Sequence, residues 1–206
     1  MDKLLTVVIP SYNVEKFLNQ TLDSFICDEA VMKKFEVIVV DDGSKDNTAK
    51  IGKEYADKYP DTFRVISKEN GGHGSTINCG IRNAVGKYFK VVDGDDWVNT
   101  ADFVKLVEDL EKTESEYVFT NYYEYYDDVN RQKAVDFPQF KDGTEYDFAD
   151  VANKVYIPMH ALVIKTSVLK DNNIVIDEKC FYVDVEYVMF PVPFVNKVTF
   201  FDLHVY

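Results

Sequence analysis

Four consecutive residues, Asp93-Gly94-Asp95-Asp96, are the strongest candidates for chemistry in this sequence, because they directly follow a predicted strand over residues 88–92. Residues two apart on an extended backbone face the same way, and Gly94 allows a bend, so Asp93 and Asp95 can address one ligand. Carboxylate oxygens suit hard cations such as Mg²⁺ or Mn²⁺, which usually take one or two carboxylates together with substrate phosphates. An Asp-rich turn that caps a helix explains the same residues equally well.

A second acidic segment, Asp41-Asp42-Gly43-Ser44, ends the apolar run over residues 35–40. Its carboxylates suit hydrogen bonding with a nucleoside, although a turn followed by a helix cap is the more ordinary role. The glycines at 71, 72 and 74 could admit a phosphate to the N-terminus of a helix capped by Ser75, and plain turn geometry is again the commoner explanation. The first predicted strand is followed by Pro10-Ser11-Tyr12-Asn13, so the glycine fingerprint of a dinucleotide-binding dehydrogenase is absent there.

Strands and helices alternate along the first 121 residues. Short apolar runs predict strands over residues 4–9, 35–40, 63–67, 88–92 and 116–121. Three-and-four spacing of apolar residues, together with capping residues, predicts helices near 14–26, 46–58, 75–84 and 101–113. This order implies an α/β fold of right-handed βαβ units, with a mostly parallel sheet flanked by helices and a first strand that stops at Pro10. Ligands of such sheets bind beyond the carboxyl ends of the strands, so the polar segments at 10–13, 41–44 and 93–96 should converge on one crevice.

The pattern changes after residue 121. Tyrosines and acidic residues crowd 122–128, and a polar stretch with Pro138 and Gly143 follows, which predicts irregular or antiparallel structure to about residue 150. The aromatic residues here would be costly to leave in water, so this stretch is not expected to be a linker. A strand over 161–165, a helix over 166–171, an acidic segment at 182–187 and a last strand over 197–201 follow.

Composition narrows the class of protein. The chain has 206 residues, 36 acidic against 23 basic side chains and a net charge of -13, which argues against binding to nucleic acid or to an acidic lipid surface. Cys27, Cys79 and Cys180 are widely spaced and fit no metal pattern, as expected for reduced thiols in the cytosol. No apolar run reaches the ~18 residues of a membrane span and no basic secretory start is present, so a soluble single domain is expected.

Taken in order, four segments of the sequence resemble the family 2 glycosyltransferases, which have the GT-A nucleotide-sugar-binding fold. They are 7–13, 39–44, Asn70-Gly71-Gly72 and 92–96, and the segment at 182–186 matches more loosely. The resemblance implies an inverting enzyme that moves a sugar from a nucleotide diphosphate, expected to be a UDP-sugar, to an acceptor hydroxyl in polysaccharide or glycoconjugate synthesis. It also implies a donor-binding region over 1–120 and a smaller acceptor-side region of the same domain over 121–206, truncated at the C-terminus.

The resemblance implies a role for each matching residue. Those assigned to donor binding are Pro10, Tyr12, Asp41, Asp42, Asn70, Asn78 and Asp93. Asp95, together with Asp93, would hold a divalent cation, Mn²⁺ or Mg²⁺, at the phosphates. Asp184 would be the general base that takes the proton of the acceptor hydroxyl. His160 and Glu186 are candidates on the acceptor side, and a solvated Asp at a helix start is the ordinary alternative for Asp184.

Two departures from the family pattern bear on the site. Many members have Ala-Arg-Asn after the glycine loop, whereas this chain has Thr76-Ile77-Asn78, so an arginine that could hold the diphosphate is missing. Phosphate neutralisation would then rest on the cation and on Lys68 or Arg82. The Glu-Asp pair common at the base is Val183-Asp184 here, which keeps the base and loses its acidic neighbour.

The remaining signals are weaker and leave alternatives open. His73 could reach the phosphates and residues 122–126 could stack on sugar rings, but ordinary packing explains each at least as well. A module that binds a nucleotide sugar without transferring it is the first rival function, because the chain ends at Tyr206 in strand-like residues. A nucleotidyltransferase, which would consume a nucleoside triphosphate, is the second. A cytoplasmic protein is expected, with any contact to the inner face of a membrane made by parts outside this chain.

Overall fold

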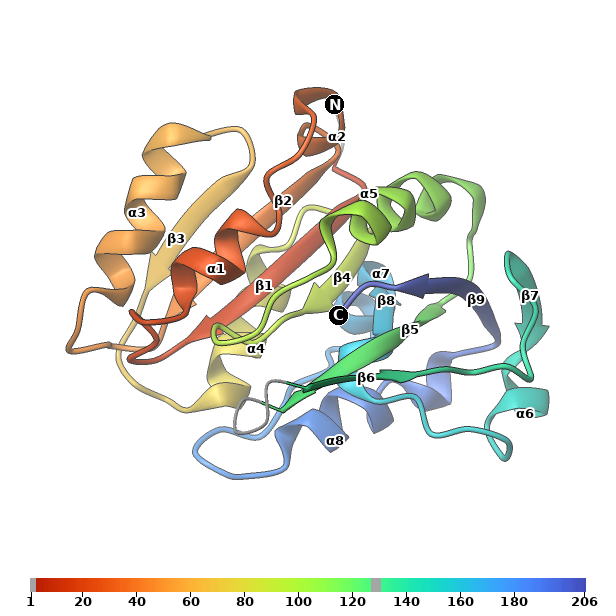
Figure 1. Cartoon of the computed structure of the whole chain (residues 1–206). Helices are drawn as coiled ribbons and strands as arrows, with labels where there is room; N and C mark the ends of the chain where they lie inside the picture. The colour runs from red at the N-terminus through yellow and green to blue at the C-terminus, as the bar shows by residue number, and fades with distance from the viewer. Residues whose placement is uncertain (1–2, 127–130) are drawn as a thin grey trace.

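The computed structural model describes residues 3–126 and 131–206, and these form one mixed sheet with helices on both faces (Figure 1). The strands are β1 (Leu5–Ser11), β2 (Phe35–Asp41), β3 (Phe63–Ser67), β4 (Tyr88–Val91), β5 (Tyr117–Tyr126), β6 (Arg131–Val135), β7 (Thr144–Asp147), β8 (Leu162–Lys165) and β9 (Lys197–His204). Their order is β3-β2-β1-β4-β8-β5-β9-β7, and β6 pairs with β5.

The predicted parallel sheet is the half formed by β3, β2, β1 and β4, which pair in parallel throughout. All residues of β1 and β2 are buried, as expected for parallel strands that are covered on both faces. The prediction that the first strand stops at Pro10 is wrong, because β1 continues to Ser11. Pro10 lies beyond the last β1–β4 pair, Val8 with Val91, so its missing N–H costs no ladder bond, and its carbonyl accepts from the N–H of Gly94.

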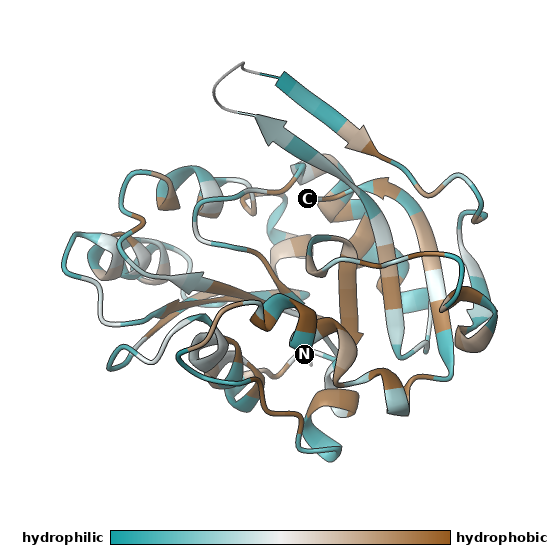
Figure 2. Ribbon diagram, turned by 90° about the horizontal axis from the view of Figure 1, so that it is seen from below, coloured by the Kyte–Doolittle hydropathy of each residue, from teal (hydrophilic) through white to brown (hydrophobic). Residues whose placement is uncertain are grey.

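The other half of the sheet is mixed. β8 lies between β4 and β5 and is antiparallel to both, whereas β5 and β9 are parallel. The region predicted to be irregular or antiparallel contains β6 and β7, which pair antiparallel to β5 and β9. β5 extends to Tyr126, five residues past its predicted end, because its outer part pairs with β6. Figure 2 shows this hairpin projecting from the body, with β6 mostly hydrophilic.

Two groups of helices cover the sheet. The helices are α1 (Leu18–Asp23), α2 (Glu29–Met32), α3 (Thr48–Lys58), α4 (His73–Asn83), α5 (Thr100–Asp109), α6 (Phe148–Val151), α7 (Thr166–Asp171) and α8 (Val183–Met189). Side chains of α1, α3 and α5 share one apolar cluster, and those of α4, α7 and α8 share another on the opposite face. The helix predicted over 14–26 is shorter than expected. The prediction that Ser75 caps the next helix is also wrong, because α4 begins at His73 after Gly72 and the Ser75 hydroxyl donates back to the Gly72 carbonyl.

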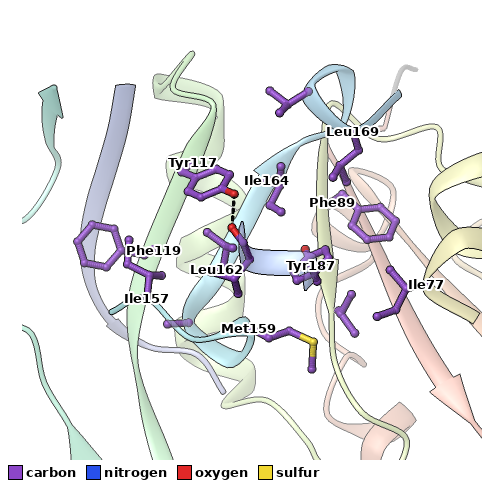
Figure 3. Close-up of a cluster of buried hydrophobic side chains, with 14 of the residues drawn as sticks. Ile77, Phe89, Tyr117, Phe119, Ile157, Met159, Leu162, Ile164, Leu169 and Tyr187 are labelled. Atoms are coloured by element: carbon purple, nitrogen blue, oxygen red, sulfur yellow. Dashed lines mark hydrogen bonds between the residues drawn. The ribbon is translucent and has the colours of Figure 1, made fainter. Parts of the chain in front are cut away.

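The second apolar cluster fixes α8 against the sheet (Figure 3). Tyr187 of α8 is fully buried beside Phe89 of β4, with ring centroids 6.2 Å apart. The Tyr117 hydroxyl on β5 donates to the carbonyl of Val188 at 2.7 Å. Burial of one such aromatic side chain stabilises a fold by roughly 2–3 kcal/mol, so α8 is held firmly by its inner face.

The three cysteines are spread over the fold and form no disulfide with one another. Cys79 is buried, Cys27 is half-buried and Cys180 is exposed, and all three carry free thiols. No helix in the described ranges has the length and apolar character that a bilayer crossing requires.

Candidate active site

The turn that follows β4 holds a half-buried carboxylate, Asp93. Burial, together with the charges of Asp96, Asp95 and Asp184, raises the pKa of Asp93 to about 7. Its Oδ1 lies 3.3 Å from Nε2 of His73, the first residue of α4. That nitrogen is buried and makes no hydrogen bond to the described residues. The side chains of Asp93 and His73 therefore meet here, and the charges of three further carboxylates act on Asp93.

A cation fits this place by its donor atoms. Carboxylate oxygens of Asp93 and Asp96 and a ring nitrogen of His160 lie within 4.8 Å of one another. Asp95 is exposed and stands outside that group. The structure thus brings together one of the two predicted metal ligands with two other residues, and the assignment of Asp95 as main ligand stays a prediction. Two carboxylates and an imidazole suit Mn²⁺ or Mg²⁺ by charge and donor type.

Two residues that the sequence did not single out support this group. The Tyr206 hydroxyl donates to Oδ2 of Asp96 at 2.7 Å and accepts from the N–H of Asp93 at 3.4 Å. Lys90, fully buried on β4, donates to the carbonyl of His160 at 2.6 Å. A lysine within a buried strand is itself a signal, because a charged side chain is rarely buried without a specific partner.

Asp42 organises the glycine loop. It is 2% exposed, and its Oδ1 accepts from Lys68 Nζ at 2.5 Å and from the N–H of Gly71 at 2.9 Å. Its Oδ2 accepts from the N–H of Gly72 at 2.8 Å. The carboxylate has therefore several partners within the chain, and its predicted contact with a base or ribose stays a prediction.

The other donor-side candidates surround the same loop. Pro10 is buried in β1, and Tyr12 beside it is 50% exposed at the carboxyl edge of the sheet. The Asp41 carboxylate accepts from the N–H of Ser44 at 3.1 Å, which shapes the turn after β2. The Asn70 side chain donates to the carbonyl of Asp42 at 2.9 Å. The structure thus gathers these residues at one edge, as the fold predicted.

Asn78 has a different set of neighbours. It is 3% exposed, and both ends of its amide bond the backbone of Ile176: Nδ2 donates to the carbonyl at 2.8 Å and Oδ1 accepts from the N–H at 2.9 Å. The amide is therefore occupied within the chain, and its predicted contact with the donor stays a prediction.

Asp184 is the second residue of α8 and is half-buried. Its carboxylate makes no hydrogen bond to any residue that the structure describes. Burial lowers the pKa values of His73 and His160 and raises that of Asp93; the Asp184 charge opposes the first two shifts and adds to the third. A charge that acts on all three lies close to them. The Oε2 of Glu186, two residues further along α8, accepts from the N–H of Asp177 at 2.8 Å, and its predicted place on the acceptor side stays a prediction.

A cavity of about 610 Å³ adjoins the acidic turn. Asp95 and Asp96 line it, together with the aromatic side chains of Phe17, Trp97, Tyr123, Tyr125 and Tyr206. Of the tyrosines expected on the acceptor side, Tyr122 instead faces His160, with ring centroids 6.0 Å apart. The acidic turn therefore borders this aromatic cavity through Asp95 and Asp96.

The parallel half-sheet, the acidic turn at its carboxyl edge and the later carboxylate on α8 define a glycosyltransferase domain of the GT-A class. The family model of glycosyl transferase family 2 matches residues 6–172, which is most of the chain. The chain belongs to glycosyltransferase family 2.

Curated relatives share part of this chain. It is 37% identical over 123 residues to the uncharacterized glycosyltransferase EpsJ of Bacillus subtilis, covering 60% of this chain and 35% of that protein. It is 34% identical over 125 residues to glycosyltransferase GlyA of Streptococcus pneumoniae, covering 61% and 18%. The minor teichoic acid biosynthesis protein GgaB of Bacillus subtilis is 34% identical over 111 residues, covering 54% and 12%. The chain thus spans about a third or less of the length of these relatives.

Solved structures share the whole fold. TarS 1-349 of S. aureus, in complex with UDP-GlcNAc, superposes with a TM-score of 0.80 at 24% identity, covering 98% of this chain and 57% of that one. The mannosyltransferase PcManGT from Pyrobaculum calidifontis, in complex with GDP-Man and Mn²⁺, gives a TM-score of 0.70 at 18% identity, covering 100% and 56%. At these identities the likeness establishes the fold, and it confirms the GT-A architecture predicted from the sequence.

Proposed function

We propose that this chain forms the catalytic domain of an inverting glycosyltransferase that moves a sugar from a UDP-sugar to an acceptor hydroxyl. The observation that carries the proposal is Asp184, a carboxylate free of hydrogen bonds to described residues, whose charge acts on both Asp93 and His73. An inverting transfer needs a bound donor and a carboxylate placed to accept the proton of the acceptor hydroxyl. The TarS complexes with UDP-GlcNAc and UDP support the choice of a uridine nucleotide.

On the donor side, the proposed contacts follow the carboxyl edge of the sheet. Tyr12 and Pro10 lie beside the base, and Asp41 and Asp42 bond the base or ribose either directly or through the loop that they hold. Asn70 continues this edge, since its side chain already bonds the carbonyl of Asp42. Asp93 faces the ribose and the phosphates from the end of β4.

We assign the cation to Asp93 with Asp95, extended by Asp96 and His160, whose donor atoms lie close enough to share an ion with Asp93. Such a cation supplies charge neutralisation for the departing nucleoside diphosphate when it is bound. The chain has little else for this task at the turn, because Lys68 is engaged with Asp42.

Asp184 is the proposed general base. An alcohol is a weak nucleophile until a positioned carboxylate accepts its proton as attack proceeds. Inversion requires the base on the side of the sugar opposite the leaving group, so the donor sugar lies between Asp93 and α8. The acceptor then enters from residues 121–206, and a growing polysaccharide or glycoconjugate is the acceptor class in keeping with GgaB among the relatives.

The test is a transfer assay with a panel of UDP-sugars and Mn²⁺, run on the wild-type chain and on Asp184→Asn. We expect the variant to lose sugar transfer and donor hydrolysis while UDP affinity in calorimetry stays within about twofold, because the amide keeps the shape and loses the basic site. Asp171→Asn, at the exposed end of α7, is the matched control.

Three results would overturn parts of the proposal. Unaltered turnover in Asp184→Asn removes the base assignment. Binding of UDP-sugars without any transfer or hydrolysis by the wild-type chain favours a non-catalytic binding module. Release of pyrophosphate from UTP and a sugar phosphate identifies a nucleotidyltransferase instead.

A further inference from the structure

The segment between α7 and α8, residues 172–182, lies across the first turns of α4. Ile176 in its middle is fully buried, and the Asn78 amide bonds both the N–H and the carbonyl of Ile176, at 2.9 and 2.8 Å. Because both ends of the amide bond the backbone of Ile176, they fix that residue in position and orientation. Nδ2 of Asn78 also donates to Oε1 of Glu178 in the same segment, at 3.3 Å. Asn78 and Ile176 are 98 positions apart in the sequence.

The glycines of the glycine loop and of the first turn of α4 make the second contact with this segment. The carbonyl of Gly71 accepts from the N–H of Lys179 at 3.0 Å. A Cβ on Gly74 would lie 2.0 Å from the carbonyl oxygen of Asp177, so the segment packs directly on the α4 backbone. Asp42 holds Gly71 and Gly72 from the other side. The glycine loop, α4 and segment 172–182 are therefore joined by direct backbone contacts.

The far end of the segment leads into the helix of the proposed base. Glu186 on α8 accepts from the N–H of Asp177 at 2.8 Å, which closes the segment onto α8. Lys179 and Tyr182 have left-handed backbone conformations, with φ of 58° and 64°, although neither is glycine. Such conformations persist where surrounding contacts determine them, so this segment has a single imposed path into α8.

We propose that Asn78 is a positioning residue for Asp184 and not a ligand of the donor. Through Ile176 and the Asp177–Glu186 contact, it sets the position of the second residue of α8. This inference rests on the proposed function, in which Asp184 is the base. It also gives the Asn of the Thr76-Ile77-Asn78 motif a role that needs no phosphate contact.

Asn78→Ala is the first test. We expect kcat for sugar transfer to fall about 10- to 100-fold, because displacement of a catalytic group by roughly 1 Å has an effect of that size. The KM for the UDP-sugar and the calorimetric Kd for UDP should change less than twofold. Hydrogen exchange of the amides of 176–186 should become faster. Asn83→Ala is the control. It removes an amide from the same helix that donates to the carbonyl of Cys79, and we expect it to behave as wild type.

Loss of UDP affinity in Asn78→Ala, with exchange at 176–186 unchanged, would show a donor ligand and overturn the inference. Unchanged kcat would overturn it as well. If Asn78→Ala does not fold, Glu186→Ala removes the hydrogen bond that joins the segment to α8, and kcat should fall. Glu186→Gln keeps an oxygen acceptor for the Asp177 N–H, so kcat should return to the wild-type value. Absence of transfer by the wild-type chain refutes the proposed function separately, and the exchange and UDP measurements then decide the positioning role alone.

Discussion

The ammonium group of Lys90 donates to the main-chain carbonyl of His160 at 2.6 Å inside the protein, and this bond joins the parallel half of the sheet to the mixed half. Lys90 is fully buried on β4, three residues before Asp93. Its ammonium also lies 5.5 Å from the centre of the Tyr206 ring. The residue therefore holds the backbone of His160 against β4, the strand that leads into the acidic turn.

Burial lowers the pKa of Lys90 to about 7, far below its usual value of 10.5. Between pH 7 and 10.5 the unfolded chain binds a proton here that the folded chain does not, so this group makes stability rise with pH in that window. In Lys90→Met the contribution is absent. We expect the free energy of unfolding of wild type, measured with urea, to rise relative to that of the variant by about 3 kcal/mol between pH 7 and 9.5. A constant difference across that range contradicts the prediction.

Asp93 should give the opposite slope. Its folded pKa of about 7 is above the usual value of 3.8, so between about pH 4 and 7 the folded chain binds the extra proton and stability falls as pH rises. With a chelator present, the free energy of unfolding of Asp93→Asn should rise relative to that of wild type by about 3 kcal/mol between pH 5 and 8. Mn²⁺ at pH 8 should stabilise wild type and not the variant. Equal thermal shifts with Mn²⁺ in both proteins would remove Asp93 from the cation site.

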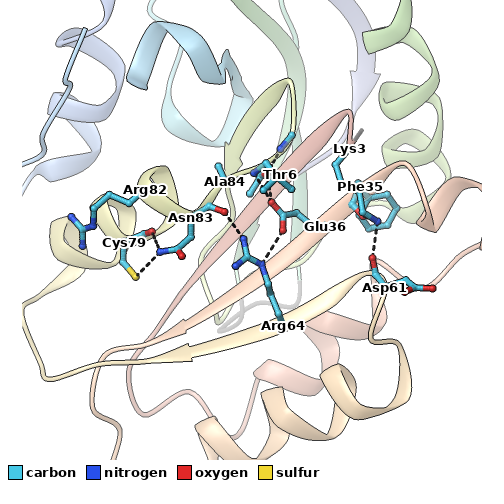
Figure 4. A network of polar contacts seen from close by, with 12 residues as sticks. Lys3, Thr6, Phe35, Glu36, Asp61, Arg64, Cys79, Arg82, Asn83 and Ala84 are labelled. Carbon is cyan, nitrogen blue, oxygen red and sulfur yellow. Dashed lines mark hydrogen bonds and ion pairs between the residues drawn. The ribbon is translucent and has the colours of Figure 1, made fainter. Parts of the chain in front are cut away.

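Glu36 is the centre of a buried hydrogen-bond network near the amino ends of the parallel strands, away from the candidate active site (Figure 4). Its Oε1 accepts from the Thr6 hydroxyl at 2.6 Å and from the N–H of Val85 at 2.9 Å, and its Oε2 accepts from Arg64 Nε at 2.9 Å. Glu36→Ala should lower the free energy of unfolding by about 2–4 kcal/mol, since it leaves these donors unpaired and Arg64 is partly solvated. UDP affinity should not change, because the network is remote from the carboxyl edge. A matching loss of UDP affinity in folded protein would show that the network and the carboxyl edge are coupled.

The part of the fold that the sequence predicts best is the part with local signals. Strands 35–40 and 63–67 and the helix over 166–171 match β2, β3 and α7 closely, because apolar runs between turn residues determine them. The insertion of β8 between β4 and β5 has no such signal. It depends on pairing between residues about 75 positions apart, as in Phe89 with Ile164. Periodicity within one segment does not encode its neighbour in a sheet.

The site divides in the same way. The acidic turn and the glycine loop stand at strand ends, so topology alone places them together. The partners of Asp96 could not be predicted, since Tyr206 and His160 reach it from β8 and β9 regions whose order in the sheet was unknown. The partner of Asn78 is hidden for a related reason: its amide bonds Ile176, a residue in a segment without periodicity. The sequence shows which residues have the right chemistry, and long-range pairing decides which of them meet.

Asp42→Asn tests the glycine loop. The exchange replaces one acceptor oxygen by an N–H₂ group that faces donors, so at least one of the contacts with Lys68, Gly71 and Gly72 is lost. We expect UDP affinity to fall at least about tenfold and stability by about 1–3 kcal/mol, from a buried donor left unsatisfied. Asp41→Asn, which keeps an oxygen for the Ser44 N–H, is the milder comparison. UDP binding equal to wild type in Asp42→Asn would mean that the loop takes no part in donor binding.

Tyr206→Phe isolates the hydrogen bond that holds Asp96. Burial raises the pKa of Asp96 and the Tyr206 hydroxyl lowers it, so removal of that hydroxyl favours the protonated acid, which is a poorer cation ligand. We expect Mn²⁺ affinity at pH 7 to fall about 3- to 10-fold and stability to fall by about 1 kcal/mol. Tyr123→Phe is the control, because Tyr123 stacks on His204 and its hydroxyl has no hydrogen bond within the described ranges. The loss of Mn²⁺ affinity should shrink as pH rises and Asp96 ionises in both proteins. A loss that is the same at pH 6 and pH 8 would show that Tyr206 acts through packing and not through the charge of Asp96.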